Sequence, residues 1–278
     1  MTLPDSFCKH GTFIYDIPIT IQNYGSMEKM IEAMKKCGMS HAWIRIHGRH
    51  HLYGDHKLNK ELVSALEENG IAVAAWGWCQ GENIDREAKL AIDGTENLNI
   101  VDYVADIEHG VNKSYWTPGE VHAFLSKVKD GLKKSSHLAV SSHGFIDWHS
   151  PPLMKAAEDV VDAFAPQVYW FWFPNGTMID QFGEYKRDNP AEYARLCLDR
   201  WQFHVKKPII MTAQAYWREG GMSQKTSEGK VKDFLEEFKD WDRIVGLNWW
   251  HFGNKDEAMS KNMQKAISEA NISEKFSS

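Results

Sequence analysis

The stretch Asn99-Ile-Val-Asp-Tyr-Val-Ala-Asp-Ile-Glu-His-Gly110 has the composition of a buried strand that ends in two acids. Its β-branched body is typical of a strand covered on both faces, and Gly110 provides an exit turn. Because side chains alternate along a strand, Asp106 and Glu108 share one face, with Cα atoms roughly 6–7 Å apart. Burying two carboxylates is costly unless they are paired or used in chemistry. We therefore predict an active site here, with a compensated ion cluster as the alternative.

Apolar, strand-like runs alternate with charged, helical segments about eight times along the 278 residues. Besides the acidic stretch, we predict strands at 11–17, 41–48, 71–78, 138–144, 161–172, 207–217 and 244–252. Helices are predicted at 27–36, 59–68, 84–93, 151–157, 190–204, 226–240 and 257–271, and another begins at Thr117 with a capping signal.

This rhythm predicts an α/β fold, a single (β/α)8 TIM barrel spanning residues 1–278, with 273–278 as a frayed tail. Composition shows no break that would divide the chain into two domains. An open, doubly wound sheet is the alternative fold, but the sequence has no Gly-rich phosphate turn to support it.

Charge and composition narrow the classes of function. The net charge of -6 argues against nucleic acid or an anionic membrane as partner. No apolar run is long enough for a membrane span, and the N-terminal residues do not resemble a signal peptide. We expect a monomer made in the cytoplasm. The four cysteines lack metal-binding spacing, so we predict no metal and no cofactor.

In a (β/α)8 barrel the chemistry lies at the carboxyl ends of the strands. Glu108, Asp106 and Asp16 are the predicted catalytic residues. The predicted substrate-binding residues are amide, aromatic and basic side chains at the ends of the other strands: Arg45, His47, Trp76, Trp78, Gln80, His143, Gln167, Tyr169, Trp170, Gln214, Tyr216, Asn248 and Trp250. Amides bond hydroxyl and N-acetyl groups and indole rings stack on sugars, so we expect a polysaccharide substrate.

Glycosidic cleavage needs one protonated acid at the leaving oxygen and a second, ionised group near the anomeric carbon. Two close carboxylates can divide these roles because they push each other's pKa values apart. We assign Glu108 as the acid, since it lies nearer the rim and reaches further. Asp106, which lies deeper, is expected to stay charged beside Tyr169 or Arg45, although a second acid at Asp16 would instead raise its pKa. The sequence leaves open whether configuration is retained or inverted.

Three motifs resemble the family 25 lysozyme-like muramidases: Tyr15-Asp16-Ile17, Asp106-Ile-Glu108 and Gln167-Val-Tyr-Trp170. The resemblance implies cleavage of the β-1,4 bond between N-acetylmuramic acid and N-acetylglucosamine in peptidoglycan, with Glu108 as proton donor. For such a substrate we expect the protein to reach the cell wall by phage lysis or another route without a signal. Those enzymes usually carry a further Asp on a later strand. Here Gln167, Tyr169 and Gln214 occupy the candidate positions.

Two further alternatives follow from the same residues. The chitinase-like barrels of family 18 share the Asp-x-Glu ending, but their longer acidic signature would require Asp at Val101 and Val104. A barrel that has lost turnover would bind carbohydrate or protein without cleaving it.

Two other motifs have ordinary explanations. The stretch 48–56 is rich in His, but its spacing matches no zinc motif and we expect a solvated loop. Ser142 and His143 with Asp147 suggest a nucleophile and base, but the G-x-S-x-G elbow is absent.

Overall fold

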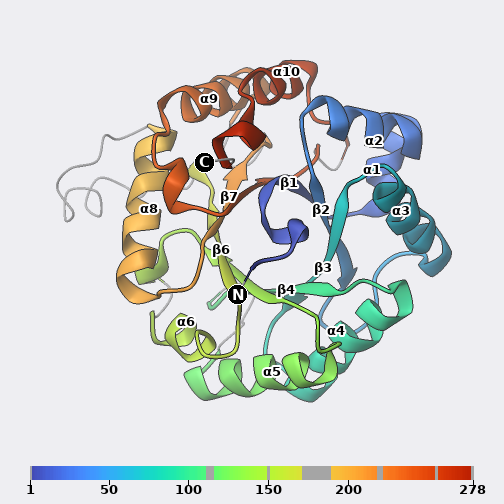
Figure 1. The fold of residues 1–278 in the computed structure, drawn as a ribbon, viewed down its shortest axis with the longest axis vertical. Coiled ribbons are helices and arrows are strands. Elements are labelled where there is room, and N and C mark those ends of the chain that lie inside the picture. Colours follow the sequence, from blue (N-terminus) through green and yellow to red (C-terminus); the bar gives the residue numbers. More distant parts are fainter. Residues whose placement is uncertain are drawn as a thin grey trace.

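The computed structural model describes residues 2–110, 116–148, 151–170, 189–217, 222–253 and 256–276. Eight parallel strands close into a barrel, each paired with the next along the chain and β8 paired with β1 (Figure 1). The strands are β1 (Lys9–Ile14), β2 (His41–His47), β3 (Ala72–Cys79), β4 (Asp102–Ile107), β5 (Leu138–His143), β6 (Ala163–Val168), β7 (Ile210–Gln214) and β8 (Gly246–Trp250). The predicted single (β/α)8 barrel is confirmed.

Helices form the outer layer of the barrel (Figure 1). They are α1 (Ile17–Tyr24), α2 (Met27–Lys36), α3 (His56–Glu68), α4 (Ile84–Leu98), α5 (Pro118–Gly131), α6 (Pro151–Ala157), α8 (Pro190–His204), α9 (Gln224–Glu237) and α10 (Lys261–Glu269). The capping signal at Thr117 is confirmed, because its side chain accepts from the backbone N–H of Glu120 while the Glu120 carboxylate accepts from that of Thr117. Among the described residues, no helix has both the length and the apolar character needed to span a membrane.

The first strand ends earlier than predicted, and this changes the role of Asp16. Strand β1 ends at Ile14, and α1 begins at Ile17 with Pro18 in its first turn. Asp16 is the N-cap of α1, and its Oδ1 accepts a hydrogen bond from Ile19 N at 3.0 Å. The carboxylate thus satisfies a free helix N–H, so the structure gives Asp16 a capping role, and its catalytic role stays a prediction.

The amino end of the barrel is closed by the N-terminal segment. The 3-10 helix η1 (Asp5–Phe7) brings Phe7 into the aromatic core inside the barrel. Ser6 Oγ donates to Asp102 at 2.5 Å, and Trp43 Nε1 donates to the Ser6 carbonyl at 2.7 Å. Since this end is packed and hydrogen-bonded, the carboxyl end of the barrel is the end available for chemistry.

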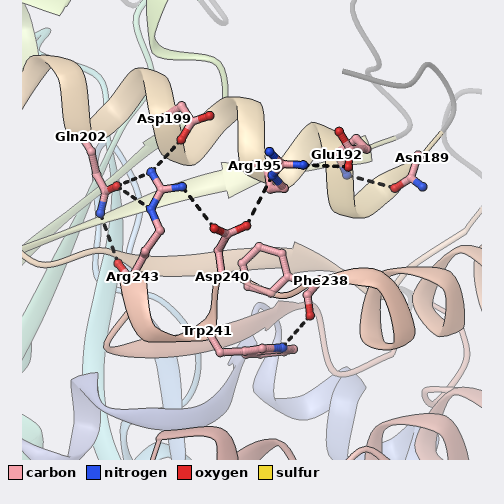
Figure 2. A network of polar contacts seen from close by, with 9 residues as sticks. All are labelled: Asn189, Glu192, Arg195, Asp199, Gln202, Phe238, Asp240, Trp241 and Arg243. Carbon is pink, nitrogen blue, oxygen red and sulfur yellow. Dashed lines mark hydrogen bonds and ion pairs between the residues drawn. The ribbon is translucent and has the colours of Figure 1, made fainter. Parts of the chain in front are cut away.

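A polar network fixes α8 to the segment before β8 (Figure 2). Arg243, in the 3-10 helix η5 (Trp241–Arg243), donates to Asp199 of α8 at 2.6 Å. The Asp240 carboxylate forms ion pairs with Arg243 at 3.4 Å and with Arg195 of α8 at 3.5 Å. Trp241 Nε1 donates to the Phe238 carbonyl at 2.8 Å. The network anchors the connection that leads into β8, which carries Trp250.

Residues 273–276 differ from the predicted frayed tail. They belong to the 3-10 helix η6 (Ile272–Phe276), in which Ile272 is buried. Ser273 Oγ donates to the Gly38 carbonyl at 3.1 Å, and the ring of Phe276 lies 6.0 Å from that of Trp241. These contacts hold the segment against the barrel, while 277–278 lie outside the described residues.

Candidate active site

The acidic strand places its two carboxylates at the carboxyl end of the barrel. Asp106 lies on the face of β4 that points into the barrel and is buried, whereas Tyr103 and Ile107 face the outer helices. Glu108 follows the last residue of β4 and is partly exposed to solvent. The side chain of Gln167, from the inner face of β6, donates to Asp106 and also lowers the pKa of Glu108, so it lies near both acids. The strand alternation predicted from the sequence therefore brings the pair to one shared site.

Gln167 connects the two acids to a neighbouring hydroxyl. Its Nε2 donates to Asp106 Oδ1 at 2.7 Å and to Ser141 Oγ at 3.1 Å. Ser141 also hydrogen-bonds Asp106. Ser141 lies opposite Asp106 in the register between β4 and β5, which is why a residue absent from the sequence prediction belongs to the site.

Burial sets the protonation of the pair. Desolvation raises the pKa of Asp106 well above its usual range, and the charge of Glu108 raises it further. Hydrogen bonds from Ser141 and Gln167 and the charge of Arg45 act in the opposite direction. Burial also raises the pKa of Glu108, against its hydrogen bond with Gln167. Burial therefore opposes the expected charge on Asp106, and the buried pair retains a proton more readily than exposed carboxyls do.

Aromatic rings surround Trp250 at the same end of the barrel. Its ring centre lies 5.3 Å from that of Phe13, 5.6 Å from Trp76, 5.8 Å from Tyr15 and 6.3 Å from Tyr169. Tyr15 is 43% exposed, and Trp250 and Tyr169 are partly exposed. These faces are suited to stacking on a sugar ring. The sequence prediction missed Tyr15, because the first strand was extended past its true end.

Four other predicted residues lie on or near this face. Trp78 is paired in register with Asp106 and is partly exposed. His143 is paired with Gln167 at the end of β5. The ring centre of Tyr216 lies 5.7 Å from that of Tyr169. Gln214 is fully buried, with Nε2 donating to the Tyr216 carbonyl at 3.3 Å.

His47 and Trp170 are not in the site, contrary to prediction. A register shift between Arg45 and His47 turns the imidazole outward, where it is fully buried and stacks on Tyr103. His47 Nε2 lies 2.6 Å from Tyr103 Oη, and burial lowers the pKa of the imidazole to about 4. Trp170 stacks on Phe234 of α9 at 5.3 Å. Both rings therefore pack between the barrel and its helices, where no glycan reaches them.

Asn248 also differs from its predicted role, while the role of Gln80 stays a prediction. Asn248 faces the interior one layer below Trp250, and its Oδ1 lies 2.9 Å from His41 Nε2, so it supports the barrel and not the rim. Gln80 is buried in the loop after β3, where its backbone N–H donates to the Glu87 carboxylate at 2.7 Å.

Glu87 is a structural residue that the sequence did not reveal. Glu87 is only 1% exposed. Its carboxylate accepts hydrogen bonds from four backbone N–H groups of the loop: Gln80 at 2.7 Å, Gly81 at 3.2 Å, Glu82 at 3.1 Å and Asn83 at 3.4 Å. Asn83 is the N-cap of α4, and Glu87 in the first turn of the same helix directs its carboxylate back into the loop. This contact fixes the loop that extends β3 beside the acidic pair.

Other candidate chemistries find no support in the described residues. Ser142 Oγ donates to the Ile107 carbonyl at 2.7 Å, and Asp147 binds Arg200 at 2.7 Å, so the two do not form a catalytic unit. Across the described ranges, no three His, Cys, Asp or Glu side chains are grouped as metal ligands.

The raised pKa of Asp106 predicts how stability depends on pH. The folded protein holds this proton more tightly than the unfolded chain, so stability falls as pH rises from about 4, the ordinary Asp pKa, through the raised value. Asp106→Asn removes this loss. The free energy of unfolding of the variant relative to wild type, measured by urea unfolding, is therefore expected to increase as the pH rises above about 4.

Asp147→Asn provides a control of opposite sign. Burial acts to raise the pKa of Asp147, but hydrogen bonds from Arg200 and His204 hold this pKa below its usual range. Its contribution is present above the ordinary Asp pKa of about 4 and lost as pH falls through the lowered value. The loss of unfolding free energy caused by Asp147→Asn should therefore become smaller as the pH falls. Parallel pH curves for the two variants would contradict the assignment.

The fold and the site together define a (β/α)8 barrel that carries an acidic pair, an amide and an aromatic rim at its carboxyl end. No protein-family model matches the sequence, and no curated protein matches it.

Several solved structures resemble the chain. Mutants of active domain 2 of chitinase from Pyrococcus furiosus have a TM-score of 0.67 at 13% identity, covering 100% of this chain and 98% of theirs. The endo-1,4-β-mannanase from Rhizomucor miehei has a TM-score of 0.64 at 8% identity, covering 100% and 97%. A fungal endo-β-N-acetylglucosaminidase from glycosyl hydrolase family 18 has 0.58 at 11%, covering 98% and 97%. At these identities the similarity establishes the fold.

Proposed function

We propose that this protein is a glycoside hydrolase that cleaves β-1,4-linked N-acetylated glycans, with the glycan strands of peptidoglycan as its substrate. The observation that carries the proposal is the acidic pair Asp106 and Glu108 at the carboxyl end of the barrel, with Gln167 donating to Asp106. This is the end where barrels of this kind perform their chemistry. The similar structures support the general class of glycoside hydrolases, since they are those of a chitinase, a mannanase and an endo-β-N-acetylglucosaminidase.

Glu108 has the properties of the general acid. A general acid must hold a proton at the working pH and then deliver it to the leaving oxygen. Burial raises the pKa of Glu108, and its partial exposure leaves the carboxyl accessible from the rim. Asp106 lies deeper and competes for the same proton, so the productive form has the proton on Glu108 and the negative charge on Asp106.

The arrangement favours an N-acetylated substrate. Most glycosidases place their two carboxyl groups on either side of the scissile bond. Here both acids come from one strand, and the side chains that contact Asp106 within the described ranges are the neutral Gln167 and Ser141. An acetamido oxygen of the sugar would then supply the attacking group, as in substrate-assisted hydrolysis. Asp106 would accept a hydrogen bond from the acetamido N–H.

Chitin is the second candidate substrate. Two of the similar structures are a chitinase and a family 18 endo-β-N-acetylglucosaminidase. Chitin and peptidoglycan share the β-1,4 linkage and the acetamido group, so the acidic pair alone does not distinguish them.

The proposal is tested by incubating wild-type protein with purified bacterial cell walls and, separately, with chitin oligomers. We expect wall turbidity to fall and mass spectrometry to detect new reducing ends on N-acetylmuramic acid. Cleavage of chitin oligomers alone would support the second candidate. Binding of both glycans without any new reducing end would contradict a hydrolase and leave the non-catalytic barrel.

A further inference from the structure

Arg45 is a buried cation on the inner face of β2. Its Cζ lies 4.1 Å from the ring centre of Tyr53, 4.6 Å from that of Tyr15 and 5.5 Å from that of Trp76. The residue is 5% exposed and lies beside Trp76 in the register between β2 and β3. Trp76 contacts Trp250, so Arg45 belongs to the aromatic end of the site.

The charge of Arg45 has no ionic partner among the described residues. Its Nε reaches the His47 carbonyl at 3.5 Å, the limit of a hydrogen bond, and Nη1 is buried with no hydrogen-bond partner. Arg200 and Arg243, by contrast, each contact a carboxylate, at 2.7 and 2.6 Å. Aromatic contacts compensate part of the cost of burying a cation, but they do not satisfy its N–H donors. A buried guanidinium with free donors is suited to bind an anion.

We infer that Arg45 recognises a carboxylate on the glycan, so that the protein prefers sugars carrying a lactyl carboxylate, as in N-acetylmuramic acid, over neutral N-acetylglucosamine. This inference rests on the proposed function, because it places the carboxylate on a glycan bound at the acidic pair. The rings of Tyr15 and Tyr53 lie against the guanidinium, so its N–H edge is the part left to bind. That edge matches the two oxygens of a planar carboxylate.

The position of Arg45 supports the same conclusion. Its charge lowers the pKa of Asp106 through space, which places both groups in one electrostatic site. No direct ion pair joins the two within the described part of the chain, so Asp106 does not neutralise the guanidinium. A carboxylate bound by Arg45 would therefore lie beside the sugar that the acids contact.

The test is calorimetric titration of two matched disaccharides into the Glu108→Gln protein, which should leave the ligands intact. Both contain N-acetylglucosamine linked to N-acetylmuramic acid, one with a free lactyl carboxylate and one with the corresponding carboxamide. We expect the carboxylate to bind roughly tenfold or more tightly, as for a charge-assisted hydrogen bond. A hyaluronan tetrasaccharide, whose carboxylate belongs to glucuronic acid, is expected to bind like the carboxamide. Tighter binding of hyaluronan would overturn the assignment to a lactyl group.

Arg45→Met, added to this protein, is expected to reduce the preference for the carboxylate to within about twofold, whereas Arg45→Lys keeps part of it. Arg49→Met is the matched control, because Arg49 lies in the adjoining loop and already pairs with Glu82 at the surface. It should keep the full preference. Equal binding of the two disaccharides, or binding of neither, overturns the role of Arg45. If discrimination persists but wild type releases no reducing ends, the proposed hydrolase fails while the Arg45 site stands.

Discussion

Replacing Glu108 with Gln is expected to lower the rate of glycan hydrolysis roughly 100-fold to 10,000-fold, the usual contribution of a general acid. Gln cannot deliver a proton to the leaving oxygen, yet it matches the shape of Glu and can still hydrogen-bond Gln167. Because burial already raises the pKa of Glu108, a neutral amide should fit the site, and the free energy of unfolding should change little. Reducing-end release on cell walls and urea unfolding measure the two effects.

Glu68→Gln is the control for this experiment, since Glu68 is exposed at the end of α3 and takes no part in the site. It should retain wild-type activity and stability. If Glu108→Gln hydrolyses walls at the wild-type rate, Glu108 is not the acid. If it loses activity only because it unfolds, the urea curves will show this directly.

The fold was predictable because its signals are local. Apolar runs, capping residues and glycine stops recur at short range, and each reflects the cost of burying an unpaired backbone group or an exposed apolar face. The alternation within β4 was equally local, and it placed Asp106 and Glu108 on one face. The predicted cap at Thr117 formed for the same reason.

The site was less predictable because its partners are distant in sequence. Ser141 reaches the site only through the register between β4 and β5. Counting residues along a strand also assumes that alternation is unbroken. The irregularity after Arg45 breaks it, so His47 points outward although its sequence position predicted a place at the rim.

The strongest structural test of this outward position is Gly77→Ala. Gly77 is paired with His47 in the register of β2 and β3, and a Cβ added there would lie 2.0 Å from His47 Nε2. The ring cannot move freely, because Tyr103 Oη lies 2.6 Å from Nε2 and the Gly48 carbonyl 2.9 Å from Nδ1. We expect a loss of about 3 kcal/mol in the free energy of unfolding, as for an overpacked core.

A double-mutant cycle separates steric overlap from other causes. His47→Ala alone should cost about 3 kcal/mol, because it opens a cavity and leaves Tyr103 Oη with a poorer partner. In His47→Ala/Gly77→Ala the new methyl occupies space that the ring has vacated, so the double variant should be no less stable than His47→Ala. Gly119→Ala, where an added Cβ meets nothing within 4 Å, is the control and should be neutral or slightly stabilising. Strictly additive losses of unfolding free energy would show that the two residues do not touch. If His47→Ala instead lost glycan binding at unchanged stability, His47 would be a substrate-binding residue, as the sequence predicted.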